Sequence, residues 1–574
     1  MMRWRPAVVA LVVIIAITAC VPPTIPPPTP PEAPPAPEKP TAEVERPPAP
    51  ARPELPEPVR LQCQGPSIPE GPSIPFAAAE GDYFVERQIV VVGLREEIAR
   101  VLEAIPELQL ERVSSTDLGR LSQWAPERLR RRKSIGPFPL ERLADLSFDV
   151  YELPAGGRVD VGEALRRILE VSEGLRKDRR LRFGVLAEPN YLIGRAPVAV
   201  SGDPNSVEGS PVSASGGLAP SDLFWQQWAF VGKQGIALFT DPSAARRTSR
   251  YSGKGVLVGV FDTSPFPEPG GYRFTGWITP TLTLCVSHPT PVVAVSSPQA
   301  FIDVRDHGLF VSSLVHAVAP SAEIHLIRVL NAQNQGDLAT LVRSLIGFLG
   351  FAADRSQLDD AVINLSLGVQ VPPDLSAVGL PADLYGRLQA IGGPSGWSGE
   401  AAALEAVIDL ASAMGVVVVA ASGNDSDAAR AVPAQVPARL PTVLGVAASN
   451  DRGGRACFSN AGDVAAPGGE GAPPCRPEEI ASCSGDCPLA LIGLSLSSLT
   501  GFVYWNGTSF AAPLASGVAA LALEEMPPGT SSEDVRKRVS RGTVSVSGSA
   551  LGAGRVDVAC AMLPPADQPA RCQP

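Results

Sequence analysis

Between residues 224 and 560, short apolar runs alternate with segments whose apolar residues recur at helical spacing. The uninterrupted apolar run 255–261 is typical of a parallel strand buried on both faces. Similar runs occupy 324–330, 361–367, 416–421 and 443–448. Helical spacing lies between them at 307–318, 337–353, 400–414 and 510–523. The alternation predicts an α/β domain, at residues 223–562, with a mostly parallel sheet flanked by helices.

A second pattern precedes this domain, at residues 79–197. Strands are predicted at 87–92, 108–113, 148–153 and 181–192, and helices at 96–105 and 161–175. Their order, β-α-β-β-α-β, favours a small ferredoxin-like α+β domain. A charged insertion within it carries the basic run 128–133, which we interpret as a solvated face, with a processing site as the alternative.

The remaining segments are predicted to be linkers and a tail. Residues 20–78 are dominated by proline, which predicts an extended, semi-rigid spacer. Residues 198–222 are rich in Ser, Gly and Pro, which predicts a linker exposed to proteolysis. Residues 563–574 form a polar tail that Cys572 could pin, and the pattern assigns no structure to the insertion at 468–500.

The first 19 residues have the pattern of an export signal. Arg3 and Arg5 precede an apolar run, 7–19, that is too short for a comfortable membrane span. The run ends in Ile-Thr-Ala-Cys, which resembles a bacterial lipobox and implies cleavage before Cys20 and a lipid anchor on its thiol. An ordinary secretory signal is the alternative. No later stretch reaches about 18 uncharged apolar residues, so we expect the mature chain not to span a bilayer.

Composition narrows the possible partners. The net charge of −11 argues against general nucleic-acid binding, which requires a basic surface. Besides Cys20, an even number of cysteines remains, which in an exported chain indicates disulfides of unreadable pairing. They are Cys63, Cys285, Cys457, Cys475, Cys483, Cys487, Cys560 and Cys572. Cys285 and His288 have the gap of a zinc pair, but a lone pair is weak evidence for a metal.

Ser509 is the first candidate for chemistry. It follows Gly507-Thr508 and precedes small apolar residues that predict a buried helix. A hydroxyl at a helix N-terminus, next to a glycine turn, is well placed to attack a carbonyl. Taken alone, however, Ser509 is better interpreted as a helix N-cap.

A nucleophilic serine needs a base and an orienting acid. Of the four histidines, His307 opens a predicted helix near its buried face, and Gly308 allows another backbone to approach closely. His316, His325 and His288 have weaker contexts. Asp262 follows the strand 255–261, at the sheet edge where α/β proteins gather catalytic groups. Asn424 follows the strand 416–421, where its amide could donate to an oxyanion.

In the order Asp262, His307, Asn424, Ser509, these residues resemble the subtilisin-like (subtilase, S8) serine peptidases. Residues 507–513, Gly-Thr-Ser-Phe-Ala-Ala-Pro, fit the family pattern Gly-Thr-Ser-x-Ala-x-Pro throughout. Two motifs depart from the family: leucine replaces a threonine after His307-Gly308, and Ser264 replaces the glycine of Asp-Thr-Gly. The resemblance implies a triad of Asp262, His307 and Ser509, with Asn424 in the oxyanion hole.

The same resemblance implies a substrate cleft. Ser366, Leu367 and Gly368 would pair with substrate backbone by strand addition. Ala420, Ala421, Ser422 and Gly423 would wall the S1 pocket with them. No acidic residue lies in either segment, so we expect a broad, apolar-leaning P1 preference. The chemistry requires no metal. Structural calcium is known in the family, but no ligand pattern in this sequence places a site.

The resemblance also gives residues 79–197 a role, as an inhibitory propeptide cleaved between about Gly194 and Ser221. Such a cut would separate the peptidase from an anchor at Cys20 unless the propeptide stays bound. Two alternatives to an endopeptidase remain: a non-catalytic lipoprotein that uses a subtilase fold for peptide binding or adhesion, and an esterase or other acyl hydrolase. The esterase is disfavoured because no Gly-x-Ser-x-Gly elbow surrounds Ser509.

Overall fold

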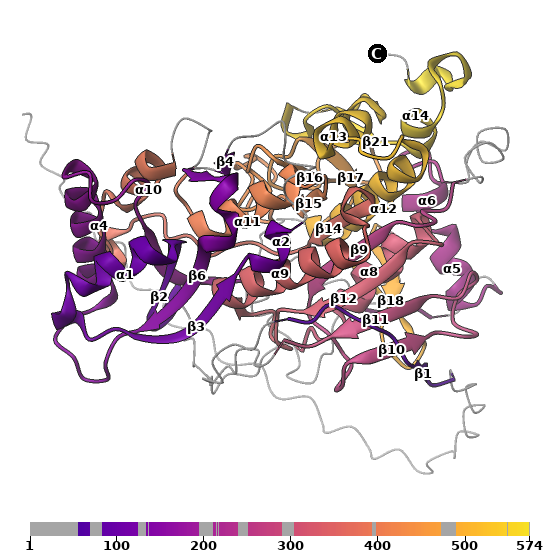
Figure 1. Cartoon of the computed structure of the whole chain (residues 1–574). Helices are drawn as coiled ribbons and strands as arrows, with labels where there is room; N and C mark the ends of the chain where they lie inside the picture. Colours follow the sequence, from indigo (N-terminus) through magenta and orange to yellow (C-terminus); the bar gives the residue numbers. More distant parts are fainter. Residues whose placement is uncertain are drawn as a thin grey trace, which may run out of the picture. The chain divides into compact units, whose positions relative to one another are not determined.

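The structure is a computed structural model (Figure 1). It describes residues 56–68, 83–123, 134–135, 137–194, 210–213, 215, 217–238, 251–289, 303–392, 398–471, 489–547 and 549–572. The predicted signal peptide, Cys20, most of the proline-rich spacer, the basic run 128–133 and three cysteines lie outside the described residues. All described residues belong to a single unit of the chain.

An 11-stranded sheet, in the order β1-β10-β11-β12-β9-β14-β15-β16-β17-β21-β20, forms the centre of the molecule. Its pairing is parallel from β11 through β21, which confirms the predicted mostly parallel α/β fold. The parallel strands are β11 (Thr283–Ser287), β12 (Glu323–Arg328), β9 (Leu257–Asp262), β14 (Ala361–Leu365), β15 (Val417–Ala421), β16 (Val443–Ser449), β17 (Val464–Pro467) and β21 (Arg555–Val556). The antiparallel strands are β10 (Gly270–Arg273) and the outer strand β1 (Val59–Leu61) on one side, and β20 (Thr543–Val544) on the other.

Helices cover both faces of this sheet (Figure 1). On β9, Leu257 and Phe261 belong to the hydrophobic cluster that contains α9 (Leu338–Asp354) and α11 (Ala402–Ala413). The alternate residues Val258 and Val260 belong to the cluster that contains α8 and α12. Because successive strand residues point to opposite faces, the two helix pairs lie on opposite sides of the sheet. The second pair is α8 (His307–Val318) and α12 (Thr508–Glu525), which pack against each other.

A five-stranded sheet, in the order β13-β7-β2-β6-β3, is built mainly from residues 84–193. Its elements are β2 (Phe84–Leu94), α1 (Arg95–Glu103), β3 (Glu111–Asp117), β6 (Leu146–Glu152), α4 (Val161–Lys177) and β7 (Leu186–Ile193). β3 begins later than predicted because Pro106–Leu108 form a 3₁₀ turn. The fifth strand, β13 (Gly336–Asp337), comes from the segment before α9 and pairs with the end of β7.

Parts of both predicted linkers are structured, contrary to expectation. Residues 56–68 are not a free spacer: β1 (Val59–Leu61) is the outer strand of the main sheet, and Cys63 forms a disulfide with Cys285. In the second linker, β8 (Ser210–Pro211) pairs with β19 (Phe502–Trp505). Composition did not predict these two strands, because each is stabilised by pairing with another strand and not by the propensity of its own sequence.

Near the C-terminus, α13 (Ser532–Arg541) and α14 (Val558–Met562) follow α12. A disulfide between Cys560 and Cys572 pins the tail, as the sequence allowed. Cys457 is disulfide-bonded too. Within the insertion at 468–500, residues 491–494 form β18, which pairs with β19. Among the described helices, none combines the length and the apolar character needed to cross a membrane.

Candidate active site

Ser509 is the second residue of α12. The N-cap of this helix is Gly507, so the structure excludes the interpretation of Ser509 as the cap. The half-buried Ser509 hydroxyl lies 3.3 Å from the carbonyl oxygen of Ser366, to which it donates. In return, the Ser366 hydroxyl donates to the Ser509 carbonyl at 2.8 Å. These bonds fix the end of β14 against the first turn of α12.

His307 is the first residue of α8, and Asp262 is the last of β9. His307 Nδ1 lies 2.7 Å from Asp262 Oδ1, and both side chains are buried, at 5% and 0% exposure. The same carboxylate oxygen accepts from the Thr263 amide at 2.7 Å, which holds its orientation. Because Nδ1 faces the carboxylate, Nε2 is the ring nitrogen left for a second partner.

Aromatic contacts bring the His307 ring to the first turn of α12. Its centroid lies 5.2 Å from that of Phe510, the residue after Ser509, and 5.2 Å from that of Trp505. The Trp505 ring meets the imidazole at an interplanar angle of 86°, an edge-to-face contact. The base candidate and the nucleophile candidate therefore lie at neighbouring positions on one rim of the sheet.

Gly308 makes the approach of α8 to β9 possible. A Cβ at Gly308 would lie 2.2 Å from the Thr263 carbonyl oxygen, which confirms the predicted close approach. The Gly308 amide also donates to the Thr263 hydroxyl at 3.1 Å. Ser264, which follows, is not among the positive-φ residues of the described chain, so serine fits this turn without strain.

Asn424 lies at the end of β15, beside the same turn of α12. Its Oδ1 accepts from the Thr508 amide at 2.9 Å and from the Thr508 hydroxyl at 3.0 Å. With Oδ1 engaged in this way, Nδ2 is the side that can donate to a ligand. The sequence did not single out Thr508, although it lies inside the Gly-Thr-Ser motif that pointed to Ser509.

The edge at Ser366–Gly368 is already paired with another strand. The Gly194 amide donates to the Gly368 carbonyl at 2.8 Å, and the Gln370 amide donates to the Leu192 carbonyl at 2.9 Å. Ile193 forms an antiparallel bridge with Val369, while β13 pairs with the other side of β7. The end of β7 thus lies between two segments of the α/β domain, as an added strand.

The predicted wall of the S1 pocket is mostly inside the sheet. Ala420, Ala421 and Ser422 are buried, and Leu365 of β14 pairs with Ala420. Gly423 is half-buried and has φ +107°, a conformation that favours glycine. Of this group, Gly423 is the residue that keeps partial exposure, and its amide donates to the Thr508 hydroxyl at 3.2 Å.

The other histidines and the metal candidates have structural surroundings. His316 is buried, with Nε2 bonded to the Pro280 carbonyl, and burial lowers its pKa. His325 is buried in β12 and bonds Glu323. Burial, together with the Arg328 charge, lowers the pKa of His288 to about 4. Cys285 is in a disulfide and cannot ligate zinc as a thiolate. The group Asp557, Cys560 and Cys572, the metal-like cluster found among the described residues, contains a disulfide as well.

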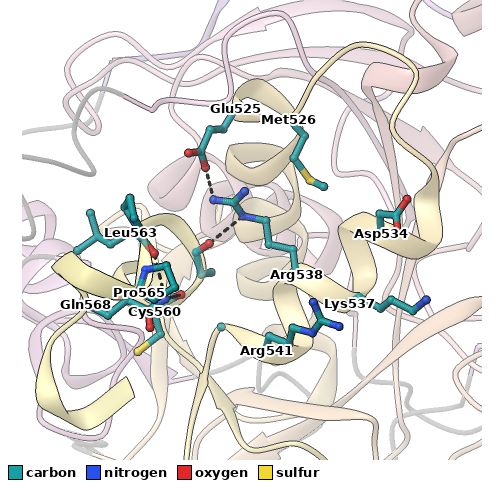
Figure 2. A pocket seen from close by; sticks show the side chains of 13 residues that line it. Glu525, Met526, Asp534, Lys537, Arg538, Arg541, Cys560, Leu563, Pro565 and Gln568 are labelled. Atoms are coloured by element: carbon teal, nitrogen blue, oxygen red, sulfur yellow. Dashed lines mark hydrogen bonds and ion pairs between the residues drawn. The ribbon is translucent and has the colours of Figure 1, made fainter. Parts of the chain in front are cut away.

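A pocket of about 780 Å³ lies beside α13 and the C-terminal tail (Figure 2). Its lining includes none of the candidate catalytic residues. Figure 2 shows Arg538 paired with Glu525 of α12. Arg538 Nε also donates to the Ala561 carbonyl at 2.9 Å. The pocket is thus crossed by contacts that hold α12, α13 and α14 together.

Residues 293–554 match the model of the Subtilase family, a span that includes His307, Asn424 and Ser509 but not Asp262. The chain is 28% identical to subtilisin amylosacchariticus of Bacillus subtilis subsp. amylosacchariticus, over 55% of this chain and 68% of that one. It is 28% identical to a subtilisin of Bacillus pumilus, over 55% and 94% of the two chains. Among solved structures, it is similar to fervidolysin of Fervidobacterium pennivorans, with a TM-score of 0.48, 18% identity and coverage of 89% and 66%.

The parallel α/β fold and the family match define a serine endopeptidase. Residues 293–554 are the part of this chain that matches the Subtilase family, and the chain is similar to the subtilisins over about 55% of its length.

Proposed function

We propose that the endopeptidase acts through Asp262, His307 and Ser509. Ser509 Oγ attacks the scissile carbonyl carbon while His307 Nε2 takes its proton, and the imidazolium then protonates the leaving amine. Asp262, bonded to Nδ1, fixes the tautomer and stabilises the imidazolium. A water activated by His307 then releases the acyl group. The observation that carries this proposal is the buried 2.7 Å contact of His307 with Asp262, at a ring that touches the turn of Ser509.

The negative charge on the carbonyl oxygen needs donors that are already in place. The Asn424 amide, oriented by Thr508, and the Ser509 backbone amide are the donors we assign. Substrate backbone would pair with Ser366–Gly368, and Gly423 would face the P1 side chain. No step requires a metal.

We further propose that the chain is made as a zymogen. The end of β7 occupies the edge at Gly368, where substrate must pair, so this strand has to leave before substrate binds. The predicted cut between about Gly194 and Ser221 can be narrowed. Ser210 and Pro211 pair with β19, and the buried Val212 bonds through its amide to Phe502, so a cut before β8 leaves this paired segment on the peptidase. We place the cut at residues 195–209.

A location outside the cytoplasm fits this chemistry and the disulfides. We propose a signal peptide at residues 1–19 and lipid attachment at Cys20. The enzyme would then act on proteins or peptides outside the cytoplasm, either anchored or released.

Active-site labelling with a fluorophosphonate tests the triad. The mature protein should be labelled and should digest casein, Ser509→Ala should lose both, and Ser516→Ala in the same helix should keep both. A protein that is processed and folded but unlabelled would support the peptide-binding alternative. Labelling with ester hydrolysis and no casein digestion would support the esterase.

A further inference from the structure

The segment 56–68 comes before the N-terminal domain in the sequence, but in the structure it packs against the peptidase domain. β1 pairs in antiparallel register with β10, Val59 opposite Arg273 and Leu61 opposite Gly271. The Trp277 indole donates to the Pro56 carbonyl at 2.7 Å. Figure 1 shows β1, in indigo, beside β10 at the edge of the main sheet.

Close packing extends this attachment beyond β1. A Cβ on Gly65 would lie 2.4 Å from Ser287 Oγ, so the chain passes directly against the end of β11. A Cβ on Gly347 in α9 would lie 3.0 Å from the Ser67 carbonyl. Pro66 is buried. The segment therefore continues from the edge of the sheet onto a covering helix.

A covalent bond completes the attachment. Cys63 and Cys285 form a disulfide across a sequence separation of 222 residues. This interval contains the whole five-stranded sheet apart from β13, and also residues 195–209, where we place the cut. Hydrolysis of a peptide bond there yields a new carboxylate and a new amine, but it leaves the two ends joined through sulfur.

We infer that residues 56–68 remain in the processed enzyme as a disulfide-linked light chain. The consequence for maturation rests on the proposed zymogen cut, whereas the link itself does not. After one cut, the N-terminal domain is still joined to the peptidase through residues 56–68, called the arm below. The domain therefore stays at a high effective concentration near the active site. Release of the inhibitor requires a second cut, between 68 and 83. Whatever the N-terminus carries, including a lipid on Cys20, then stays with the peptidase.

The test uses the full-length Ser509→Ala protein, which cannot cut itself, with a site for an exogenous protease inserted between residues 202 and 203. After digestion, the protein is denatured and its free thiols are alkylated without reductant. We expect the fragment that ends at residue 202 and the fragment 203–574 to migrate together, and to separate when dithiothreitol is added. Peptide mapping should find Cys63 linked to Cys285.

Two variants serve as matched comparisons. Cys63→Ser should separate the fragments without reductant. Cys560→Ser with Cys572→Ser removes a disulfide that spans only 12 residues within one fragment, so the fragments should stay joined. Separation of the unmutated fragments without reductant, or a map with both cysteines free, would overturn the inference. The peptide map holds even where a variant folds poorly.

The unmodified enzyme, analysed in parallel, distinguishes this inference from the zymogen proposal. An uncut chain whose map shows the Cys63–Cys285 link would refute the maturation cut and leave the tether standing. A cut chain whose mature form lacks residues 56–68 and has both thiols free would support the maturation cut and refute the disulfide link.

Discussion

Gly308 sets the approach of α8 to the end of β9, and so the position of His307. We expect Gly308→Ala to lower kcat/KM on the order of 10²-fold, because its Cβ would lie 2.2 Å from a carbonyl oxygen and displace the helix. Stability should fall by about 1–3 kcal/mol from overpacking. Gly350→Ala in α9 is the control: nothing lies within 4 Å of its Cβ, so it should leave activity intact and add about 0.5–1 kcal/mol. Equal effects of the two substitutions on activity would contradict this account.

Asp262 controls which nitrogen of His307 carries the proton. In Asp262→Asn, the amide can donate to Nδ1 and so favour the wrong tautomer, and kcat should fall by roughly 10⁴-fold, the size known for the equivalent change in trypsin. KM should change little, because Asp262 is fully buried and does not face substrate. Asp303→Asn, at a partly exposed carboxylate four residues before His307, should keep full activity. Steady-state kinetics on a peptide substrate give both parameters, and a loss confined to KM would count against the assigned role.

Single residues were predictable where the chemistry limits the choice. One histidine out of four opened a helix next to a glycine, and one serine lay in a motif with a specific pattern. Thr508 and Trp505 were not predicted as neighbours of the site residues, and Ser366 was predicted as part of the substrate edge but not as a partner of Ser509. Their contacts depend on how three strands and two helices meet, and no local pattern encodes that meeting.

Glu188 of β7 joins the N-terminal sheet to α11 of the α/β domain. Its carboxylate accepts from the amides of Ala402 and Ala403, at 2.8 and 2.7 Å, at the start of the helix. Burial raises its pKa to about 8, and burial also raises the pKa of nearby Glu405 to about 7. Tyr191 and Tyr385 face Glu188, but burial raises their pKa values further from neutrality.

The stability of this junction should therefore depend on pH. Between about 4.5 and 8, folded Glu188 holds a proton that the unfolded chain releases, so the free energy of unfolding should decrease as pH rises. We expect the melting temperature of the Ser509→Ala protein to fall from pH 5 to pH 8. Glu188→Gln should flatten that slope, and Glu405→Gln should flatten part of it. An unchanged slope in Glu188→Gln would refute the assignment.

At the scale of elements, periodicity located α8, α9, α11 and α12 within about two residues, but it did not predict α13 or α14. Its failures came from pairing rather than propensity. β1 and β8 are two- or three-residue strands in proline-rich sequence, and each exists because a partner strand offers an open edge. The strand expected at 181–192 begins at Leu186, since pairing with β2 decides where it starts.

One hydrophobic cluster extends from the N-terminal sheet to the α9 and α11 side of the α/β domain. Ile89, Val150 and Ile168 belong to the same cluster as Leu345 and Val407. The sequence predicted two domains and their order, because each has its own periodicity. The merging of the two cores could not be predicted. The apolar residues of α9 and α11 do not indicate in the sequence which partner buries them.

This shared core predicts that the peptidase folds poorly without its N-terminal domain. The test uses residues 210–574 with Cys285→Ser, which avoids a free thiol. Without the N-terminal domain, this chain exposes the faces of α9 and α11. The parallel sheet of the α/β domain also depends on contacts between distant segments, which form slowly. We expect low recovery of casein-digesting activity on dilution from denaturant. Recovery should rise several-fold when residues 83–194 are present as a separate chain during refolding and are removed before the assay. The same addition with Glu188→Arg should give no gain, since a buried cation at the start of α11 opposes docking. Equal recovery with and without the added domain would show that the shared core is unnecessary for folding.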